Sequence, residues 1–346
     1  EPAPSAPAAT APATPPPSPA AVRAGQEGPD IDLEWTDTAV GAPRRGASVC
    51  TTLRGPGAPG SPTVCIRGGR PMVAVRRRTG GVVVLDARVR RTSATSVAAA
   101  VAASDLGLRA GAIRLRLVTT PGRPVVGSGT GTLTWRPVVR TGCTRAGAGQ
   151  VFHGPRNLRR IALSFDDGPS SATPAVLSLL ARYDAHATFF VLGQAAGGKP
   201  GALRDVIAAG NTLGDHSWAH GRFPGAADMN AAKQRIAAIS GYTPCLYRPP
   251  YGLTNGRVVA DANSLGMTSV MWSTDTNDWR RRGAADIARQ ALRAVPGDIV
   301  LMHDGGGPRG QTVDALRVVL PTWRARGIEV VTVEDLLGYA PTYRVD

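Results

Sequence analysis

The chain has 346 residues, of which 42% are hydrophobic, and a formal net charge of +15. This length and apolar content are sufficient for two folded units, which excludes a wholly disordered chain. The charge comes almost entirely from arginine, because Lys199 and Lys233 are the only lysines. The arginines are scattered without a nucleic-acid-binding motif, so we expect no nucleic-acid partner and at most a weak, salt-sensitive attraction to an anionic cell envelope.

Residues 1–30 consist largely of Pro, Ala, Ser and Gly. Such a segment has too few apolar side chains to offset the entropy of ordering, so we expect a disordered tether. The sequence begins at Glu1 without a methionine, and an Ala/Pro-rich tether often follows a cleaved leader, which predicts a secreted or cell-envelope-associated protein. No run of eighteen or more apolar residues is present, so we predict no transmembrane segment.

Residues 31–145 have the pattern of short strands separated by turns. Runs rich in β-branched residues and bounded by Gly or Pro cover 63–78, 80–91, 112–120 and 129–139. This spacing predicts a small β-rich, sandwich-like domain. The Ala-rich segment 96–108 fits either a helix or an extended edge strand, and its pattern does not decide between them.

The four cysteines, Cys50, Cys65, Cys143 and Cys245, lack the CxxC spacing of a zinc finger. A Gly/Pro-rich turn flanked by strand-like residues separates Cys50 from Cys65, so we expect these two to form a disulfide, which leaves Cys143 to pair with Cys245. The alternative is four unpaired thiols, which an oxidising compartment disfavours.

After a linker at 146–157, strand-like and helix-like segments alternate from residue 158 onward. Short apolar runs predict strands at 160–165, 187–192, 268–273, 298–303 and 328–333. Helical spacing predicts helices at 174–184, 226–240, 284–294 and 311–326. Such alternation is typical of an α/β fold with a mostly parallel sheet or barrel, in which functional residues gather at the carboxyl ends of the strands.

Two pairs of polar residues suggest a metal site in this region. Asp166 and Asp167 follow the strand at 160–165 in the motif "SFDDGPS", and His216 and His220 form the i, i+4 pair of "HSWAH". Each pair also has an ordinary explanation, as turn chemistry for the aspartates and as a surface pair for the histidines. Adjacent carboxylates at a strand end favour a neighbouring positive charge, and two histidines with one carboxylate form a ligand set that leaves open positions for water.

Five motifs occur in order between residues 158 and 338, namely "SFDDGP", "HSWAH", "RPPYG", "DTNDW" and "LMHD". In these motifs the chain resembles the polysaccharide deacetylases that share a NodB homology domain, carbohydrate esterase family 4. The resemblance implies a distorted (β/α) barrel over residues 158–346, with a divalent metal held by Asp167, His216 and His220. Zinc is the expected metal, with cobalt or nickel as alternatives, and it would activate water for attack on an acetamide carbonyl.

The same resemblance implies the catalytic groups. Asp166 would act as the general base, kept ionised and oriented by Arg248. His303 would be the acid that protonates the leaving amine, with Asp278 orienting the imidazole and raising its pKa.

The resemblance further implies substrate contacts. The backbone N–H of Tyr251 would bind the oxyanion together with the metal, and Trp279 and Leu301 would line the acetyl pocket, although both side chains are also common in cores. The glycine-rich segment 304–310 is expected to be a mobile loop at the mouth of the site. His186 lies outside the motifs and is expected to be a hydrogen-bonded structural imidazole.

These features predict a metal-dependent N-deacetylase of an N-acetylglucosamine polysaccharide such as peptidoglycan or chitin-like oligomers. The segment "WSTDTNDW" is most similar to peptidoglycan-type members of the family. Two alternatives stay open, an O-acetyl esterase acting on acetylxylan and a non-catalytic carbohydrate-binding protein on the same fold. We expect a monomer in which the β-rich domain is a wall-binding module, a spacer or a cover for one side of the barrel.

Overall fold

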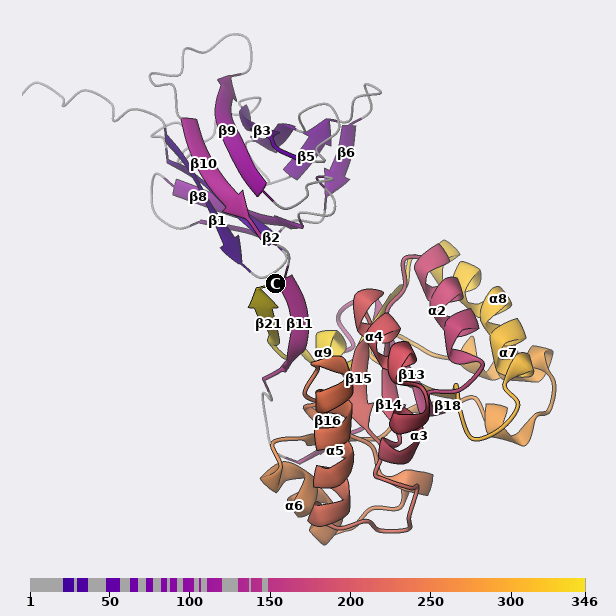
Figure 1. Cartoon of the computed structure of the whole chain (residues 1–346). Helices are drawn as coiled ribbons and strands as arrows, with labels where there is room; N and C mark the ends of the chain where they lie inside the picture. Colours follow the sequence, from indigo (N-terminus) through magenta and orange to yellow (C-terminus); the bar gives the residue numbers. More distant parts are fainter. Residues whose placement is uncertain are drawn as a thin grey trace, which may run out of the picture. The chain divides into compact units, whose positions relative to one another are not determined.

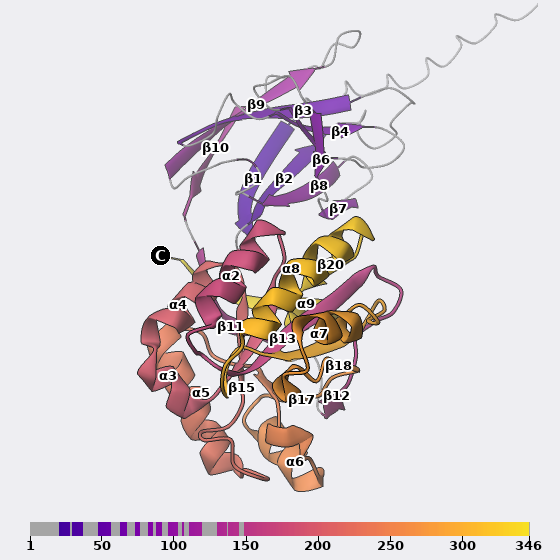
Figure 2. The ribbon, with the colours of Figure 1, turned by 90° about the vertical axis from the view of Figure 1, so that its right-hand side faces the viewer.

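The structure, a computed structural model, describes residues 21–27, 30–36, 48–56, 63–67, 73–76, 82–85, 88–91, 96–102, 106, 111–119, 130–136, 138–144 and 149–345. The chain forms two units, residues 1–138 with 345–346 and residues 139–344, whose elements can be followed in Figures 1 and 2. None of the helices in the described ranges has the length and hydropathy needed to span a bilayer.

Two antiparallel sheets make up the first unit. One sheet has the strand order β1-β2-β8-β7, and the other has the order β10-β9-β3-β4-β5-β6. The bounds of these strands are β1 Ala21–Glu27, β2 Asp30–Thr36, β3 Ser48–Arg54, β4 Thr63–Arg67, β5 Val73–Arg76, β6 Val82–Leu85, β7 Arg88–Arg91, β8 Ser96–Ala102, β9 Gly111–Thr119 and β10 Thr130–Trp135.

The two sheets share one hydrophobic core. In β2, Ile31, Leu33 and Trp35 are buried and the residues between them are partly exposed, as in a strand with one face against a core. The Trp35 indole N–H donates a hydrogen bond of 2.7 Å to Thr51 Oγ1 in β3, so the opposite sheet satisfies this buried polar group. The N-terminal region is therefore β-rich and sandwich-like, as predicted.

For two segments of this unit, the structure either differs from the sequence-based prediction or decides between the alternatives that the sequence leaves open. Strand β1 lies within the segment 1–30 that the composition predicts to be disordered; its Val22 is buried in the shared core, and the whole strand pairs with β2. Residues 1–20 of the expected tether lie outside the described residues. The ambiguous segment 96–108 begins with strand β8, whose Ala98 and Ala99 are buried.

A parallel sheet forms the centre of the second unit, with the order β12-β17-β16-β15-β14-β13-β19-β18 and with β20 beside β13. All its described strand pairs are parallel. The strands are β12 Gln150–Val151, β13 Arg160–Gly168, β14 Ala187–Val191, β15 Thr212–Asp215, β16 Leu246–Tyr247, β17 Thr268–Val270, β18 Thr274–Asp275, β19 Ile299–His303 and β20 Glu329–Val331.

Helices cover this sheet, and α2, α8 and α7 lie side by side in Figures 1 and 2. The helices of the unit are α2 Thr173–Arg182, α3 Gly193–Gly198, α4 Pro200–Ala208, α5 Ala226–Ser240, α6 Gly256–Ser264, α7 Ala284–Ala291, α8 Gly310–Ala325 and α9 Val333–Leu337, with the 3₁₀ turns η1 Pro250–Gly252 and η2 Asp278–Arg280. This arrangement confirms the predicted α/β class and distorted barrel.

Helices α2, α5, α7 and α8 correspond to the predicted ones, whereas α3, α4, α6 and α9 are additional. Helix α3 has the sequence GQAAGG, in which no apolar period marks a helix. The strand expected at 328–333 ends at Val331, because Thr332 caps α9 and its Oγ1 accepts a 3.1 Å hydrogen bond from the Asp335 N–H.

The second unit begins at residue 139, before the expected linker at 146–157. The reason is β11 (Val138–Cys143), which pairs with β21 (Pro341–Val345).

The cysteine pairs are the expected ones. Cys50 lies opposite Cys65 across β3 and β4, and Cys143 at the end of β11 meets Cys245 just before β16. Both pairs are within disulfide-bonding distance.

Candidate metal and catalytic site

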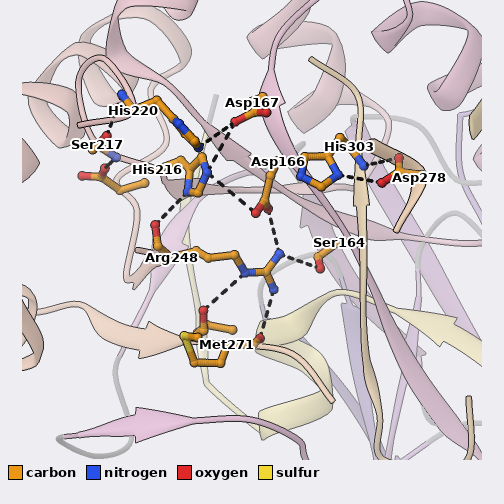
Figure 3. Close-up of polar contacts among 12 residues, drawn as sticks. Ser164, Asp166, Asp167, His216, Ser217, His220, Arg248, Met271, Asp278 and His303 are labelled. Atoms are coloured by element: carbon orange, nitrogen blue, oxygen red, sulfur yellow. Dashed lines mark hydrogen bonds and ion pairs between the residues drawn. The ribbon is translucent and has the colours of Figure 1, made fainter. Parts of the chain in front are cut away.

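The carboxyl ends of three strands bring the polar motifs together. Asp166 and Asp167 lie near the end of β13, His216 directly follows β15, and His303 is the last residue of β19. Strands β13 and β19 are neighbours, and Asp166 is in register with His303. Motifs that are distant in the sequence therefore meet at one edge of the sheet, as Figure 3 shows.

Asp167, His216 and His220 form a cluster whose ligand atoms all lie within 4.8 Å of one another. Asp167 Oδ1 is 3.5 Å from His216 Nε2 and 3.3 Å from His220 Nε2. Two ligands about 2.0–2.2 Å from a tetrahedral zinc ion would be separated by about 3.4 Å, so the spacing suits a metal. Asp167 Oδ1 is buried without a hydrogen-bond partner among the described residues, which leaves its lone pairs available to a cation.

A backbone carbonyl fixes the tautomer of His216. Its Nδ1 lies 2.7 Å from the carbonyl oxygen of Arg248. Because a carbonyl only accepts, Nδ1 carries a proton, which leaves Nε2, on the side of Asp167, as the nitrogen that a metal could bind. This is the form of imidazole that binds a metal.

The two histidines reach one side of the cluster through a tight turn. Ser217 and His220 both have positive φ, 72° and 60°. Asp215 Oδ1 accepts a 2.7 Å hydrogen bond from the Ser217 N–H, and Ser217 Oγ accepts one of 3.0 Å from the His220 N–H. The i, i+4 pair thus lies in the turn that follows β15.

Charges in the cluster favour cation binding. Burial would raise the pKa of Asp167, but the neighbouring His216, His303 and His220 outweigh the burial and lower this pKa to about 2. Burial, together with His216, lowers the pKa of His220. An ionised carboxylate and neutral imidazoles are the protonation states that metal binding requires.

Asp166 has a different partner, the buried guanidinium of Arg248. Nη1 of Arg248 donates to Asp166 Oδ1 at 2.7 Å and to Ser164 Oγ at 2.9 Å. Its Nε and Nη2 donate to the carbonyls of Val270 and Met271. Burial lowers the pKa of Arg248, and the neighbouring Asp166 opposes this shift.

His303 is held by Asp278. The imidazole Nδ1 lies 2.7 Å from Asp278 Oδ1, and Asp278 Oδ2 accepts hydrogen bonds from the His303 N–H at 2.9 Å and from Thr312 Oγ1 at 2.8 Å. Burial would lower the pKa of His303, but the Asp278 carboxylate outweighs it and raises the pKa. The pairing leaves Nε2 of His303 as the nitrogen that can donate a proton to a substrate.

The glycine-rich segment 304–310, expected to be a mobile loop, packs against Asp167. A Cβ at Gly305 or Gly306 would overlap Asp167, and Gly306 also has a φ of +69°. The guanidinium of the buried Arg309 donates to the carbonyls of both glycines, with Nη2 3.3 Å from that of Gly306. The absence of a Cβ at these two glycines therefore lets the loop backbone approach Asp167, a residue of the candidate metal site, closely.

Asp304 joins the loop to helix α2. Its Oδ2 accepts a hydrogen bond from Thr173 Oγ1, and a Cβ at Gly168 would overlap its carboxyl group. Burial, with the nearby charges of Asp166 and Asp167, raises the pKa of Asp304 to about 7. The Asp304 carboxyl group thus lies between the end of β13 and the start of α2.

The three predicted substrate contacts lie around the same edge. Tyr251 is 60% exposed, and its ring centroid is 4.2 Å from that of His220. Trp279, 48% exposed, follows Asp278 in η2. Leu301 is buried in β19, two residues before His303 and so on the same face of the strand.

Sequence patterns did not reveal Ser164, Arg309 or Thr312. Ser164 is the one polar residue between Ile161 and Phe165, which is a usable signal, whereas Thr312 reaches Asp278 only through the position of α8. The hydrogen-bonded role expected for His186 is not supported at Nδ1, which is buried without a partner among the described residues.

The fold and the site define a class, an α/β protein with a distorted barrel of parallel strands and a candidate metal site of two histidines and one carboxylate beside two further charged pairs. Residues 153–270 match the model of the polysaccharide deacetylase family. A peptidoglycan-N-acetylglucosamine deacetylase of Bacillus cereus is 37% identical over 194 residues, which cover 54% of this chain and 91% of that protein. The chain belongs to the polysaccharide deacetylase family, and its metal cluster agrees with the divalent-metal dependence of that family.

Two further comparisons agree with this assignment. The peptidoglycan-N-acetylglucosamine deacetylase PgdA of Listeria monocytogenes is 38% identical over 188 residues, covering 52% of this chain but only 39% of that longer protein. A peptidoglycan N-acetylglucosamine deacetylase solved in complex with 4-naphthalen-1-yl-N-oxidanyl-benzamide superposes with a TM-score of 0.51 at 30% identity, covering 55% of this chain and 92% of that one.

Proposed function

We propose that the chain is a divalent-metal-dependent hydrolase that removes acetyl groups from N-acetylglucosamine units of a cell-wall polysaccharide, peptidoglycan being the foremost substrate. The observation that carries this proposal is the presence, at one strand-end edge, of a metal cluster, a carboxylate paired with arginine and an imidazole paired with a carboxylate. The similarity to two peptidoglycan-N-acetylglucosamine deacetylases supports the choice of substrate.

Asp167, His216 and His220 would hold the metal. A divalent cation bound there supplies a Lewis acid and lowers the pKa of water toward about 7. Zinc fits a set of two nitrogens and one oxygen, and cobalt or nickel would be accepted by the same donors.

Asp166 would act as the general base. Its Oδ1 is occupied by Arg248, so Oδ2, 3.7 Å from His216 Nε2, is the oxygen free to take a proton beside the cluster. The hydrogen bond from Arg248 holds the carboxylate in place, so that Oδ2 stays directed towards the candidate metal site.

His303 would act as the general acid. With Nδ1 held by Asp278, the protonated imidazole donates from Nε2 to the leaving amine nitrogen. An amine leaves readily only after protonation, whereas an alkoxide of an acetyl ester depends less on an acid. A general acid at His303 therefore favours an amide substrate over an O-acetyl ester.

The remaining substrate contacts are assigned on position. The backbone N–H of Tyr251 would bind the oxyanion, because Tyr251 lies beside His220. Trp279 and Leu301 would line the acetyl pocket. Location outside the cytoplasm follows from a cell-wall substrate and from two cysteine pairs at disulfide distance, which suit an oxidising compartment.

Acetate release tests the proposed function. We would measure it in parallel on peptidoglycan, N-acetylglucosamine oligomers and acetylxylan, with Asp167→Ala as the inactive control. We expect release from the two N-acetylated substrates to exceed release from acetylxylan. Preferential hydrolysis of acetylxylan would make the chain an O-acetyl esterase, and release from none would leave a carbohydrate-binding protein.

A further inference from the structure

Four exposed arginines lie on two sides of the catalytic edge. Arg222 follows His220 by two residues, and its guanidinium carbon is 5.7 Å from the ring centroid of Tyr251. On the side of the acid His303, the run "RRR" at 280–282 follows Trp279, with the guanidinium carbon of Arg280 4.7 Å from the Trp279 ring. We call these four residues, Arg222, Arg280, Arg281 and Arg282, the arginine rim.

Within the part of the chain that the structure describes, the rim has no acidic partners. Among residues 149–345, none of the ion pairs involves a rim arginine. By contrast, Arg257 on α6, Arg289 on α7 and Arg317 on α8 each pair with an aspartate on the same helix. The positive charge of the rim is therefore available to a ligand.

The charges in the interior of the site have partners, unlike those of the rim. The interior holds the carboxylates of Asp166, Asp167 and Asp278, all buried or nearly so. Arg248, His303 and the proposed metal ion would neutralise these carboxylates, whereas the rim arginines can attract an anionic substituent of the substrate. Guanidinium groups suit this role because their planar fork matches the two oxygens of a carboxylate.

Exposed aromatic side chains accompany the rim on both sides. Tyr251 and Trp279 are 60% and 48% exposed, unusually high for large rings beside a buried site. An exposed ring gives a sugar a flat apolar surface, and the adjacent arginines would contact substituents on the neighbouring sugar. The arrangement suits a sugar chain that carries acidic groups.

We propose that the arginine rim selects glycan strands that carry carboxylate substituents over neutral N-acetylglucosamine polymers. This inference rests on the proposed deacetylase function and adds the charge of the preferred substrate. Because the rim is exposed, its contribution falls as ionic strength rises.

The test compares one glycan in two charge states. Peptidoglycan strands with free carboxylates and the same strands after amidation would be given to the wild type and to Arg222→Gln/Arg281→Gln/Arg282→Gln, and kcat/KM for acetate release measured at low and high salt. Arg280 is left in place because it lies nearer to its ring, 4.7 Å from that of Trp279, than Arg222 does to that of Tyr251, 5.7 Å. The matched control is Arg289→Gln/Arg317→Gln, which removes paired arginines from α7 and α8.

The ratio of kcat/KM for free over amidated strands is the readout. We expect the rim variant to lower this ratio by about 10-fold, from three exposed charges that each contribute a few-fold, and high salt to lower it in the wild type. An unchanged ratio, or the same loss in the control, would overturn the inference. If the wild type deacetylates neither strand, the proposed function fails and the inference with it. The single variant Arg222→Gln, expected to lower the ratio about 2- to 3-fold, serves if the triple variant does not fold.

Discussion

Arg248 and Asp166 form a buried ion pair in which Nη1 lies 2.7 Å from Oδ1. The carbonyl oxygen of the same arginine is 2.7 Å from Nδ1 of His216. One residue thus orients the proposed base through its side chain and a proposed metal ligand through its backbone. The two adjacent aspartates consequently have different neighbours, which predicts different consequences of replacing them.

Replacing the aspartates should separate metal binding from proton transfer. Asp167→Ala removes a ligand and should abolish both metal content and turnover. Asp166→Asn keeps the shape of the side chain but cannot accept a proton, so turnover should fall by about 10²- to 10⁴-fold with the metal retained. Elemental analysis and acetate release on both variants would check this; equal metal loss in the two would refute the division of roles.

Loss of His303 should harm amide cleavage more than ester cleavage. His303→Ala is expected to slow an N-acetyl substrate by about 10²- to 10⁴-fold and an activated aryl acetate far less, with metal content unchanged. Asp278→Asn removes the group that raises the pKa of His303, so the basic limb of the pH–rate profile should move to lower pH. Equal slowing of both substrates by His303→Ala would assign this residue to positioning alone.

Gly306→Ala should weaken metal binding, although Gly306 is not a ligand. Its added Cβ would overlap the carboxylate of Asp167 in a backbone conformation with φ of +69°. We expect about 10-fold weaker affinity in a competition titration with a chelating dye, the scale typical of a disturbed second shell. Gly310→Ala is the control, because a Cβ there meets no atom within 4 Å. Affinities equal to the wild type in both variants would show that the loop does not position Asp167.

The pair Cys143 and Cys245 should stabilise the second unit. A bond between them closes a loop with a sequence separation of 102 residues. Replacing both by alanine is expected to lower the free energy of unfolding of this unit by about 2–5 kcal/mol, measured by urea denaturation under non-reducing conditions. The variant Cys50→Ala/Cys65→Ala should act on the first unit instead. A midpoint for the second unit unchanged by loss of Cys143 and Cys245 would argue against a bond.

The parts of the site that the sequence predicts are those that follow directly from strand ends. Asp166 directly follows the apolar run 160–165 and His303 ends the run 298–303, so the parallel-sheet rule alone places them at one edge. Thr312 and Arg309 could not be found in this way, because their contacts depend on where α8 begins relative to η2 and to the glycine loop.

In the fold as well, elements with a clear local sequence pattern are predicted, whereas elements that depend on tertiary contacts are not. Helices with a clear apolar period, such as α2 and α8, were predicted, whereas α3 consists of small residues and is placed by its surroundings. Strand β1 was missed because its own composition is poor in apolar residues; its pairing with β2 accounts for its order.

The central claim is that Asp167, His216 and His220 hold a divalent metal on which acetate release depends. The most direct measurement is acetate release from peptidoglycan by protein stripped with a chelator and then titrated with zinc, cobalt or nickel, with bound metal quantified at each step. We predict negligible release without metal and recovery that saturates at about one metal ion per chain. Full activity in a stripped preparation shown to contain no metal would contradict the account.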